Sequence, residues 1–191
     1  MSWLIIAVIL LVAFGPVLWL IPSRRDKRLA ALRLAARQAG LNVEIEHLPK
    51  LNASAEDRVS PGGVIRDPVV DCAAYSHILG RRLHLLPHWR LLKDSEGTDA
   101  PRSGWTFNPV PERVNPYWER LWECFTDFFE MLPDDAVGLE LKERSIVLYW
   151  LESPASDVDS VARMAESFRD LGTRLEDLES RLEAELADAD S

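Results

Sequence analysis

The sequence predicts an α+β fold with one N-terminal transmembrane helix, a small mixed α+β cytoplasmic domain and a long C-terminal amphipathic helix. Three observations carry this prediction: an uncharged apolar run at the start, short strand-like runs in the middle and a heptad pattern at the end. We expect four segments: a transmembrane anchor at 1–22, a basic juxtamembrane helix at 23–40, the cytoplasmic domain at 41–156 and an acidic helix at 157–191.

The opening run, residues 3–21, contains no charged side chain. As a helix it would be about 28 Å long, close to the ~30 Å hydrocarbon core of a bilayer. Trp3 and Trp19 stand near its ends, where indole rings favour the headgroup region. A cleaved signal peptide is the alternative, but its basic residues would precede the apolar run, whereas here they follow it. We therefore expect a retained anchor.

A basic cluster follows at once and consists of Arg24, Arg25, Lys27 and Arg28. Basic residues beside a membrane span stay on the cytoplasmic side. We therefore expect a single-pass membrane protein with its N-terminus outside and its C-terminus in the cytoplasm. The cluster and the two tryptophans are the candidate membrane-interface residues, and their expected ligands are the lipid bilayer and its anionic headgroups.

The net charge of −9 is distributed unevenly. Residues 24–40 carry six basic and one acidic side chain (+5), residues 41–156 carry twelve and nineteen (−7), and residues 157–191 carry four and eleven (−7). An acidic body argues against nucleic-acid binding, which requires cations against the phosphates. The two cysteines, Cys72 and Cys124, fit a reducing compartment and provide no disulfide framework.

Ser23 and Asp26 match a capping box, and Gly40 is a suitable terminator, so a helix is predicted between them. Its narrow apolar stripe consists of Leu29, Leu32, Ala36 and Ala39. Two interpretations stay open: a helix that lies on the membrane surface, and a connecting helix that packs on the domain.

Alternating apolar and polar residues from 41 to 48 predict a half-buried strand, and the Pro- and Gly-containing residues 49–68 predict a loop. Further strand candidates are residues 69–79, 82–92 and 104–107. Pro87 interrupts the second of them, which indicates an edge position or a bend.

Asn115 and Pro116 predict the start of a helix. Its apolar face carries Trp118, Leu121, Trp122, Phe125, Phe128, Phe129 and Leu132. We interpret these aromatic residues as core, with a partner or lipid groove as the alternative. Residues 137–141 and 145–151 then predict a hairpin, whose second strand we expect to be central in the sheet.

The last predicted helix, about residues 157–187, has apolar residues at spacings that alternate between three and four. They are Val161, Met164, Phe168, Leu171, Leu175, Leu178 and Leu182. This heptad seam is the candidate self-association surface of a homodimer, in which Arg174 and Glu179 could pair across two parallel helices. The alternative is a helix that covers the sheet of its own chain and ends in a frayed acidic tip.

The sequence contains few signs of catalytic chemistry. His84 and His88 have the spacing of a helical metal pair, but Pro87 breaks that geometry and no further ligand cluster completes a site. Ser76 and His77 are neighbours on a predicted strand and point to opposite faces, so they cannot form a dyad. We therefore expect no enzyme, no catalytic residue, no cofactor and no metal.

An apolar N-terminal helix, a basic helix and the pattern D-x-V-x-x-G-G-V before a strand resemble the YajC accessory subunit of the bacterial Sec translocase. The residues of this pattern are Asp57, Val59, Gly62, Gly63 and Val64. The resemblance covers the first third of the chain, and the later helices and hairpin have no counterpart in that family. It implies a non-enzymatic accessory role in a bacterial inner membrane, associated with protein translocation.

We therefore expect an accessory or scaffold protein that holds membrane or cytoplasmic protein partners together. The alternative is a membrane-tethered enzyme or ligand-binding domain whose site is built from residues distant in sequence. A deep pocket with convergent polar groups would favour this alternative, whereas a flat surface would favour the scaffold.

Overall fold

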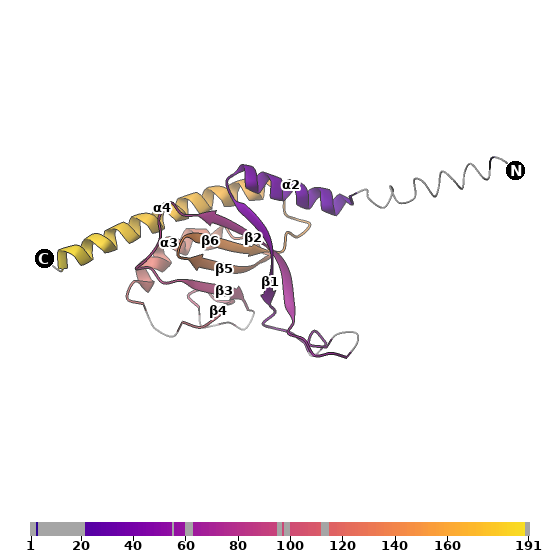
Figure 1. The fold of residues 1–191 in the computed structure, drawn as a ribbon, viewed down its shortest axis with the longest axis horizontal. Helices are drawn as coiled ribbons and strands as arrows, with labels where there is room; N and C mark the ends of the chain where they lie inside the picture. The colour runs from indigo at the N-terminus through magenta and orange to yellow at the C-terminus, as the bar shows by residue number, and fades with distance from the viewer. Residues whose placement is uncertain are drawn as a thin grey trace.

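The structure, a computed structural model of the 191-residue chain, describes residues 3, 22–54, 56–59, 63–94, 97, 100–111 and 115–189. These residues form three helices and six strands (Figure 1). The helices are α2 (Arg24–Gln38), α3 (Trp118–Glu130) and α4 (Val158–Ala189). The strands are β1 (Asn42–Pro49), β2 (Val69–Ile78), β3 (Trp89–Lys93), β4 (Trp105–Phe107), β5 (Ala136–Lys142) and β6 (Ser145–Trp150).

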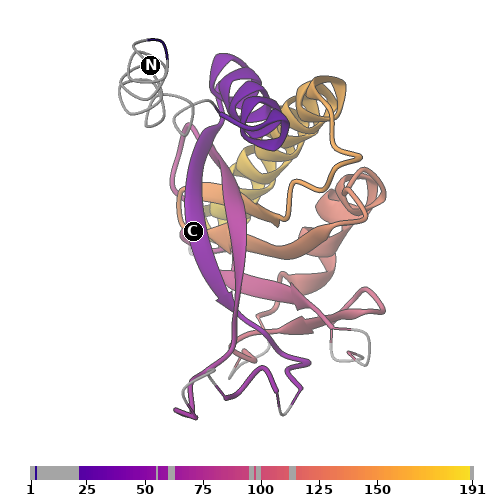
Figure 2. The ribbon, with the colours of Figure 1, turned by 90° about the vertical axis from the view of Figure 1, so that its right-hand side faces the viewer.

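The six strands form one antiparallel sheet in the order β1-β2-β6-β5-β3-β4. The three helices lie together on one face of this sheet (Figure 2). The predicted α+β composition is therefore confirmed. The predicted hairpin is confirmed as β5 and β6, and β6 is an inner strand whose side chains from Ile146 to Trp150 are all buried.

The transmembrane part of the predicted fold class is corrected. In the described part of the chain, no helix is both long and apolar enough to cross a membrane. α2 and α3 have 15 and 13 residues, fewer than the roughly 20 that a span needs, and the 32-residue α4 carries charged side chains throughout. The predicted single-pass topology and inner-membrane localisation are corrected with it. Residues 4–21, on which that prediction was based, lie outside the described residues.

One large core lies between the helices and the sheet. Its largest fully buried side chains include Trp150 and Tyr75 of the sheet, Phe125 of α3 and Phe168 of α4. The aromatic face of α3 belongs to this core, as predicted. α2 and α4, which lie in the predicted segments 23–40 and 157–191, also contribute buried side chains to this core.

The start and end of α2 follow the sequence signals. The Ser23 side chain accepts a hydrogen bond from the Asp26 amide, and the Asp26 carboxylate accepts one from the Ser23 amide. At the other end Gly40 takes a φ of +88°, and the Leu41 amide donates to the carbonyl of Ala36. Leu32 and Ala36 are buried in the core, so α2 is a helix packed on the domain, the second of the two interpretations.

The β1–β2 hairpin bends over the face of the sheet that the helices leave free (Figure 2). A second, smaller core fills this bend and consists of Leu48, Cys72, Ala74, Leu92, Val147 and Tyr149. Gly138 makes the bend possible, because a Cβ at this position would lie 3.2 Å from Leu48 and 2.9 Å from the ring of Tyr149. The Leu48 side chain of β1 therefore lies over Gly138 of β5.

Two predicted elements differ in their bounds. The predicted strand at 82–92 is limited to β3, which begins at Trp89, because Pro87 and the preceding loop cannot join a ladder. α3 begins at Trp118 and not at Asn115. The Asn115 side chain instead accepts a hydrogen bond from the Tyr117 amide at 2.8 Å.

Candidate functional site

The six residues predicted to lie at a membrane interface do not act as one group. Trp3 is 85% exposed, and Trp19 lies outside the described residues. Arg24, Arg25 and Lys27 are exposed on the first turns of α2. Contact of these three with lipid headgroups stays a prediction.

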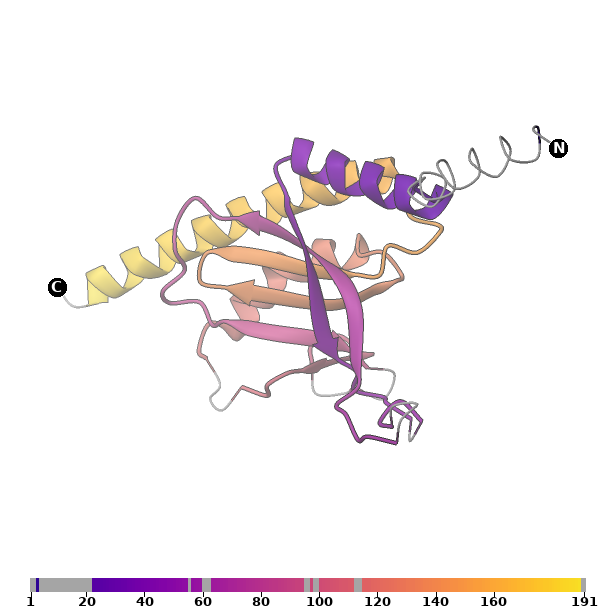
Figure 3. The ribbon, with the colours of Figure 1, turned by 45° about the vertical axis from the view of Figure 1, so that its right-hand side comes forward.

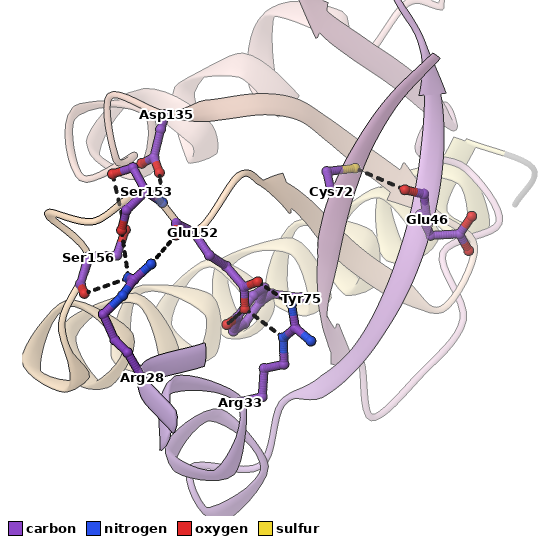
Figure 4. Close-up of polar contacts among 9 residues, drawn as sticks. All are labelled: Arg28, Arg33, Glu46, Cys72, Tyr75, Asp135, Glu152, Ser153 and Ser156. Carbon is purple, nitrogen blue, oxygen red and sulfur yellow. Dashed lines mark hydrogen bonds and ion pairs between the residues drawn. The ribbon is translucent and has the colours of Figure 1, made fainter. Parts of the chain in front are cut away.

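Arg28, the fourth basic residue, turns back onto the domain (Figure 4). Its guanidinium donates to the backbone oxygens of Glu152 at 2.8 Å, Ser153 at 2.6 Å and Ser156 at 3.3 Å. These three oxygens belong to the loop between β6 and α4. One member of the basic cluster therefore fixes α2 on the domain.

A second arginine of α2 completes this attachment through a buried carboxylate (Figure 4). The Arg33 guanidinium forms a two-point ion pair with Glu152, in which Nε lies 2.9 Å from Oε1 and Nη2 contacts Oε2. The Tyr75 hydroxyl donates to the same Oε1 at 2.9 Å. Burial, followed by the neighbouring Glu152 charge, raises the pKa of Tyr75, so this hydroxyl stays protonated and remains a donor.

Glu152 adopts an unfavourable backbone conformation when it contacts these partners. Its φ is +52°, in the left-handed region that non-glycine residues rarely occupy. The conformation aims the carboxylate into the interior, where Arg33 and Tyr75 satisfy it. The sequence could not reveal this cluster, because Arg33 and Glu152 are 119 residues apart.

The candidate self-association residues on α4 are occupied within the chain. Val161, Met164, Phe168, Leu171, Leu175, Leu178 and Leu182 are all buried in the large core. This is the arrangement of the alternative interpretation, a helix that covers its own sheet, and the C-terminal end of α4 extends beyond the sheet (Figure 3). These seven side chains are not free to form a seam between two chains, and association through another surface stays a prediction.

The two charged residues expected to pair across a dimer have partners inside the chain. Arg174 donates to Asp127 of α3 at 2.7 Å. Glu179 is fully buried, and its carboxylate accepts three successive backbone amides, those of His84, Leu85 and Leu86. Glu179 therefore fastens the loop before β3 to α4.

The outer edge of β1 is a candidate binding feature, because β1 stands at one end of the sheet. The Lys50 amide donates to the Pro68 carbonyl at 2.9 Å, so these two residues form a hydrogen-bonded pair. The β1–β2 register is unbroken, and bonded and non-bonded pairs alternate along antiparallel strands. Val43, Ile45 and His47 therefore direct their N–H and C=O groups away from β2. Within the described residues, no backbone hydrogen bond outside the β1–β2 ladder joins these three residues to another element.

Side chains of two kinds flank this open edge. Ile45 is on the face that carries the helices and is 54% exposed. Glu44 and Glu46 are exposed on the opposite face. His47 contacts Asp71 of the neighbouring strand at 2.7 Å. The edge thus presents an apolar side chain on one face of the sheet and two carboxylates on the other.

A shallow groove of about 350 Å³ lies between α3 and α4. Its lining consists of Cys124, Asp127, Phe128, Met131, Arg163, Glu166, Ser167, Asp170, Leu171 and Arg174. The Arg174–Asp127 ion pair lies in this groove, so part of its charge is already neutralised. Burial raises the pKa of the Cys124 thiol, which disfavours a nucleophilic thiolate.

The other candidate reactive groups do not converge. His77 stacks on Phe168, and burial lowers its pKa. His88 contacts the Leu83 carbonyl, whereas His84 lies 3.8 Å from Glu143. Among the described residues, no group of three histidine, cysteine or acidic side chains could hold a metal ion. Burial also raises the pKa of Cys72 to about 11.

The residues of the YajC-like pattern lie in the loop between β1 and β2, which extends away from the sheet (Figure 3). Asp57 accepts hydrogen bonds from Lys50 at 2.7 Å and from the Ser54 amide at 2.9 Å, and these partners lower its pKa to about 2. Gly62 lies outside the described residues. Asp57 thus has a local role in this turn, and the resemblance stays a prediction.

Comparison with known proteins identifies no relative: no protein-family model, no curated protein and no solved structure matches this chain. The fold and the candidate site define the chain only as an α+β domain built on one antiparallel sheet, with an open edge at β1.

Proposed function

We propose that the chain is a non-enzymatic interaction domain that receives an extended segment of a partner protein along β1. The observation that carries this proposal is the outward-facing backbone of Val43, Ile45 and His47. A row of unpaired N–H and C=O groups is a template for a further strand, and several peptide-binding domains recognise their ligands in this way.

The other edge of the sheet is less suitable. β4 has only three residues, and Pro109, which lacks an N–H, follows two positions after it. Short edge strands and prolines are features by which proteins avoid strand addition. β1 has eight residues and no proline before its last position, so it can hold a longer partner segment.

The magnitude of the interaction is modest. Three outward-facing residues offer six hydrogen bonds, each worth about 0.5–1.5 kcal/mol, or about 3–9 kcal/mol before the cost of association. The backbone alone therefore supports weak binding, and contacts by side chains must supply the rest. Weak, reversible capture of partners suits an accessory or scaffold protein. An association with protein translocation rests on the resemblance alone and stays a prediction.

The ligand-binding alternative has the groove between α3 and α4 as its best site. The groove is wide enough for a small molecule. However, the groove contains both acidic and basic side chains, and Arg174 and Asp127 already pair with each other without a ligand. Within the part of the chain that the structure describes, the outward backbone groups of β1 are bonded to no other element, so this edge supports the interaction domain better.

Replacing Ile45 by proline tests the proposal. Proline removes an N–H that points outward, so the β1–β2 ladder should remain intact while one bond to a partner strand is lost. We expect a capped peptide of alternating valine and serine to protect the amides of Val43, Ile45 and His47 from hydrogen exchange. We expect Ile45→Pro to weaken its binding at least about tenfold, since it loses a bond and gains a steric obstacle.

Ile45→Thr is the matched control, because threonine also favours strands but retains the N–H. It should bind within about threefold of the original chain, and circular dichroism should establish that both variants are folded. Equal binding by the proline variant, or protection of amides elsewhere, would contradict strand addition at β1.

A further inference from the structure

We propose that β1 selects a partner strand in which lysine or arginine residues face Glu44 and Glu46 and an apolar residue faces Ile45. This inference rests on the proposed function, because it names the partner that strand addition at β1 would favour. The occupant is a basic segment of another protein.

The carboxylates of Glu44 and Glu46 favour this partner. Both residues are exposed, and among the described residues no hydrogen bond or ion pair reaches either carboxylate. The hydrogen bond that the Cys72 thiol donates to Glu46 at 3.6 Å ends on the backbone oxygen. Some acidic residues of the domain do have partners: Asp57 pairs with Lys50, and Glu183 pairs with Arg81. The two glutamates beside the open edge therefore remain available for charges from outside the chain.

The positions of Glu44 and Glu46 on β1 also favour a basic strand. Residues two apart on a strand point to the same face, so both carboxylates flank a strand that is added beside β1. Residues directly opposite in a ladder have Cβ atoms about 4.5–5.5 Å apart, which is close enough for opposite charges to stabilise the pair. On the other face Ile45 packs beside Ala73 of β2 and leaves an apolar surface. An alternating basic and apolar sequence matches both faces.

A second copy of this chain is disfavoured as the occupant. In a two-fold antiparallel ladder centred on Ile45, Glu44 of each copy would stand opposite Glu46 of the other. Like charges directly opposite one another are destabilising. The same carboxylates that favour a basic partner thus disfavour pairing of β1 with itself.

A charge-reversal experiment tests the inference. Capped nine-residue peptides of alternating valine and lysine, and of alternating valine and glutamate, are titrated into the full chain and into Glu44→Lys/Glu46→Lys. We expect the original chain to prefer the lysine peptide about fivefold over the valine–serine peptide, and the double variant to prefer the glutamate peptide. Both preferences should shrink at 0.5 M salt, because exposed charges are screened.

General attraction to an acidic protein must be separated from contact at β1. Glu166→Lys/Asp170→Lys is the matched control, because it changes the net charge equally but alters two exposed residues of α4 in the α3–α4 groove. This control should retain the preference for lysine. Loss of the preference in both double variants, or an unchanged preference in the β1 variant, would overturn the inference. A dimer of the free chain that Ile45→Pro dissociates would also overturn it, because the second copy would then be the occupant.

The outcomes separate the inference from the proposed function. If Ile45→Pro weakens all three peptides equally and charge reversal has no effect, strand addition stands and the preference for basic partners is wrong. If Ile45→Pro leaves binding of every peptide unchanged, strand addition at β1 itself is wrong.

Discussion

Replacing Glu179 by alanine should lower the free energy of unfolding by about 3–5 kcal/mol, because three backbone amides, one buried and two partly buried, would lose their acceptor. The carboxylate is fully buried and accepts hydrogen bonds from the amides of His84, Leu85 and Leu86. Each unsatisfied buried donor costs about 1–3 kcal/mol, and removal of the buried charge offsets part of that loss. Urea unfolding followed by tryptophan fluorescence measures the change.

Glu183→Ala is the matched control, because Glu183 lies one turn further along α4 and pairs with Arg81 at the surface. Exposed pairs contribute about 0–1 kcal/mol, so this variant should be nearly as stable as the original chain. Glu179→Gln keeps one acceptor oxygen and should lie between the two. A loss below about 1 kcal/mol for Glu179→Ala would mean that the loop amides find other acceptors.

Local signals were predicted well from the sequence. The capping box of Ser23 and Asp26, the terminator Gly40 and the hairpin of β5 and β6 each depend on residues close together in the chain. Their physical causes act within a few residues, so the pattern is sufficient. The fold class was wrong in its transmembrane part, because no described helix could cross a membrane.

The heptad pattern of α4 predicts that one helix face is buried but does not identify the surface that covers it. The seam packs on the sheet of its own chain, and Glu179, taken as a dimer contact, is bonded to a loop about 94 residues away. Burial by the chain itself and burial by a second chain produce the same apolar period.

The candidate site could not be predicted, for the same reason. Which strand stands at an edge depends on the order β1-β2-β6-β5-β3-β4, which is set by pairings between distant segments. The alternation of residues 41–48 predicts a strand and its two faces but not its missing neighbour. Likewise, nothing in the sequence indicates the ion pair between Arg33 and Glu152, because α2 and the β6–α4 loop come together only in the folded chain.

The Arg33–Glu152 pair should show an unusual order of stabilities: removal of Arg33 alone should cost more than removal of both residues. Arg33→Ala leaves the Glu152 carboxylate buried, with only Tyr75 as its side-chain donor, and should cost about 2–4 kcal/mol. Glu152→Gly removes that charge, and glycine adopts a φ of +52° without strain. The side chain of Arg33, 29% exposed, can then turn to water.

The double variant Arg33→Ala/Glu152→Gly should therefore be more stable than Arg33→Ala, with a coupling energy of about 1–3 kcal/mol in the double-mutant cycle. Unfolding by urea at pH 7 measures all three variants, and Arg37→Ala, an exposed arginine on the last turn of α2, is the control for loss of a basic residue. If the two single costs simply add, the ion pair does not hold α2 in place. If removal of Arg33 alone costs more than removal of both residues, the buried Glu152 charge and its pairing with Arg33 keep α2 packed on the domain.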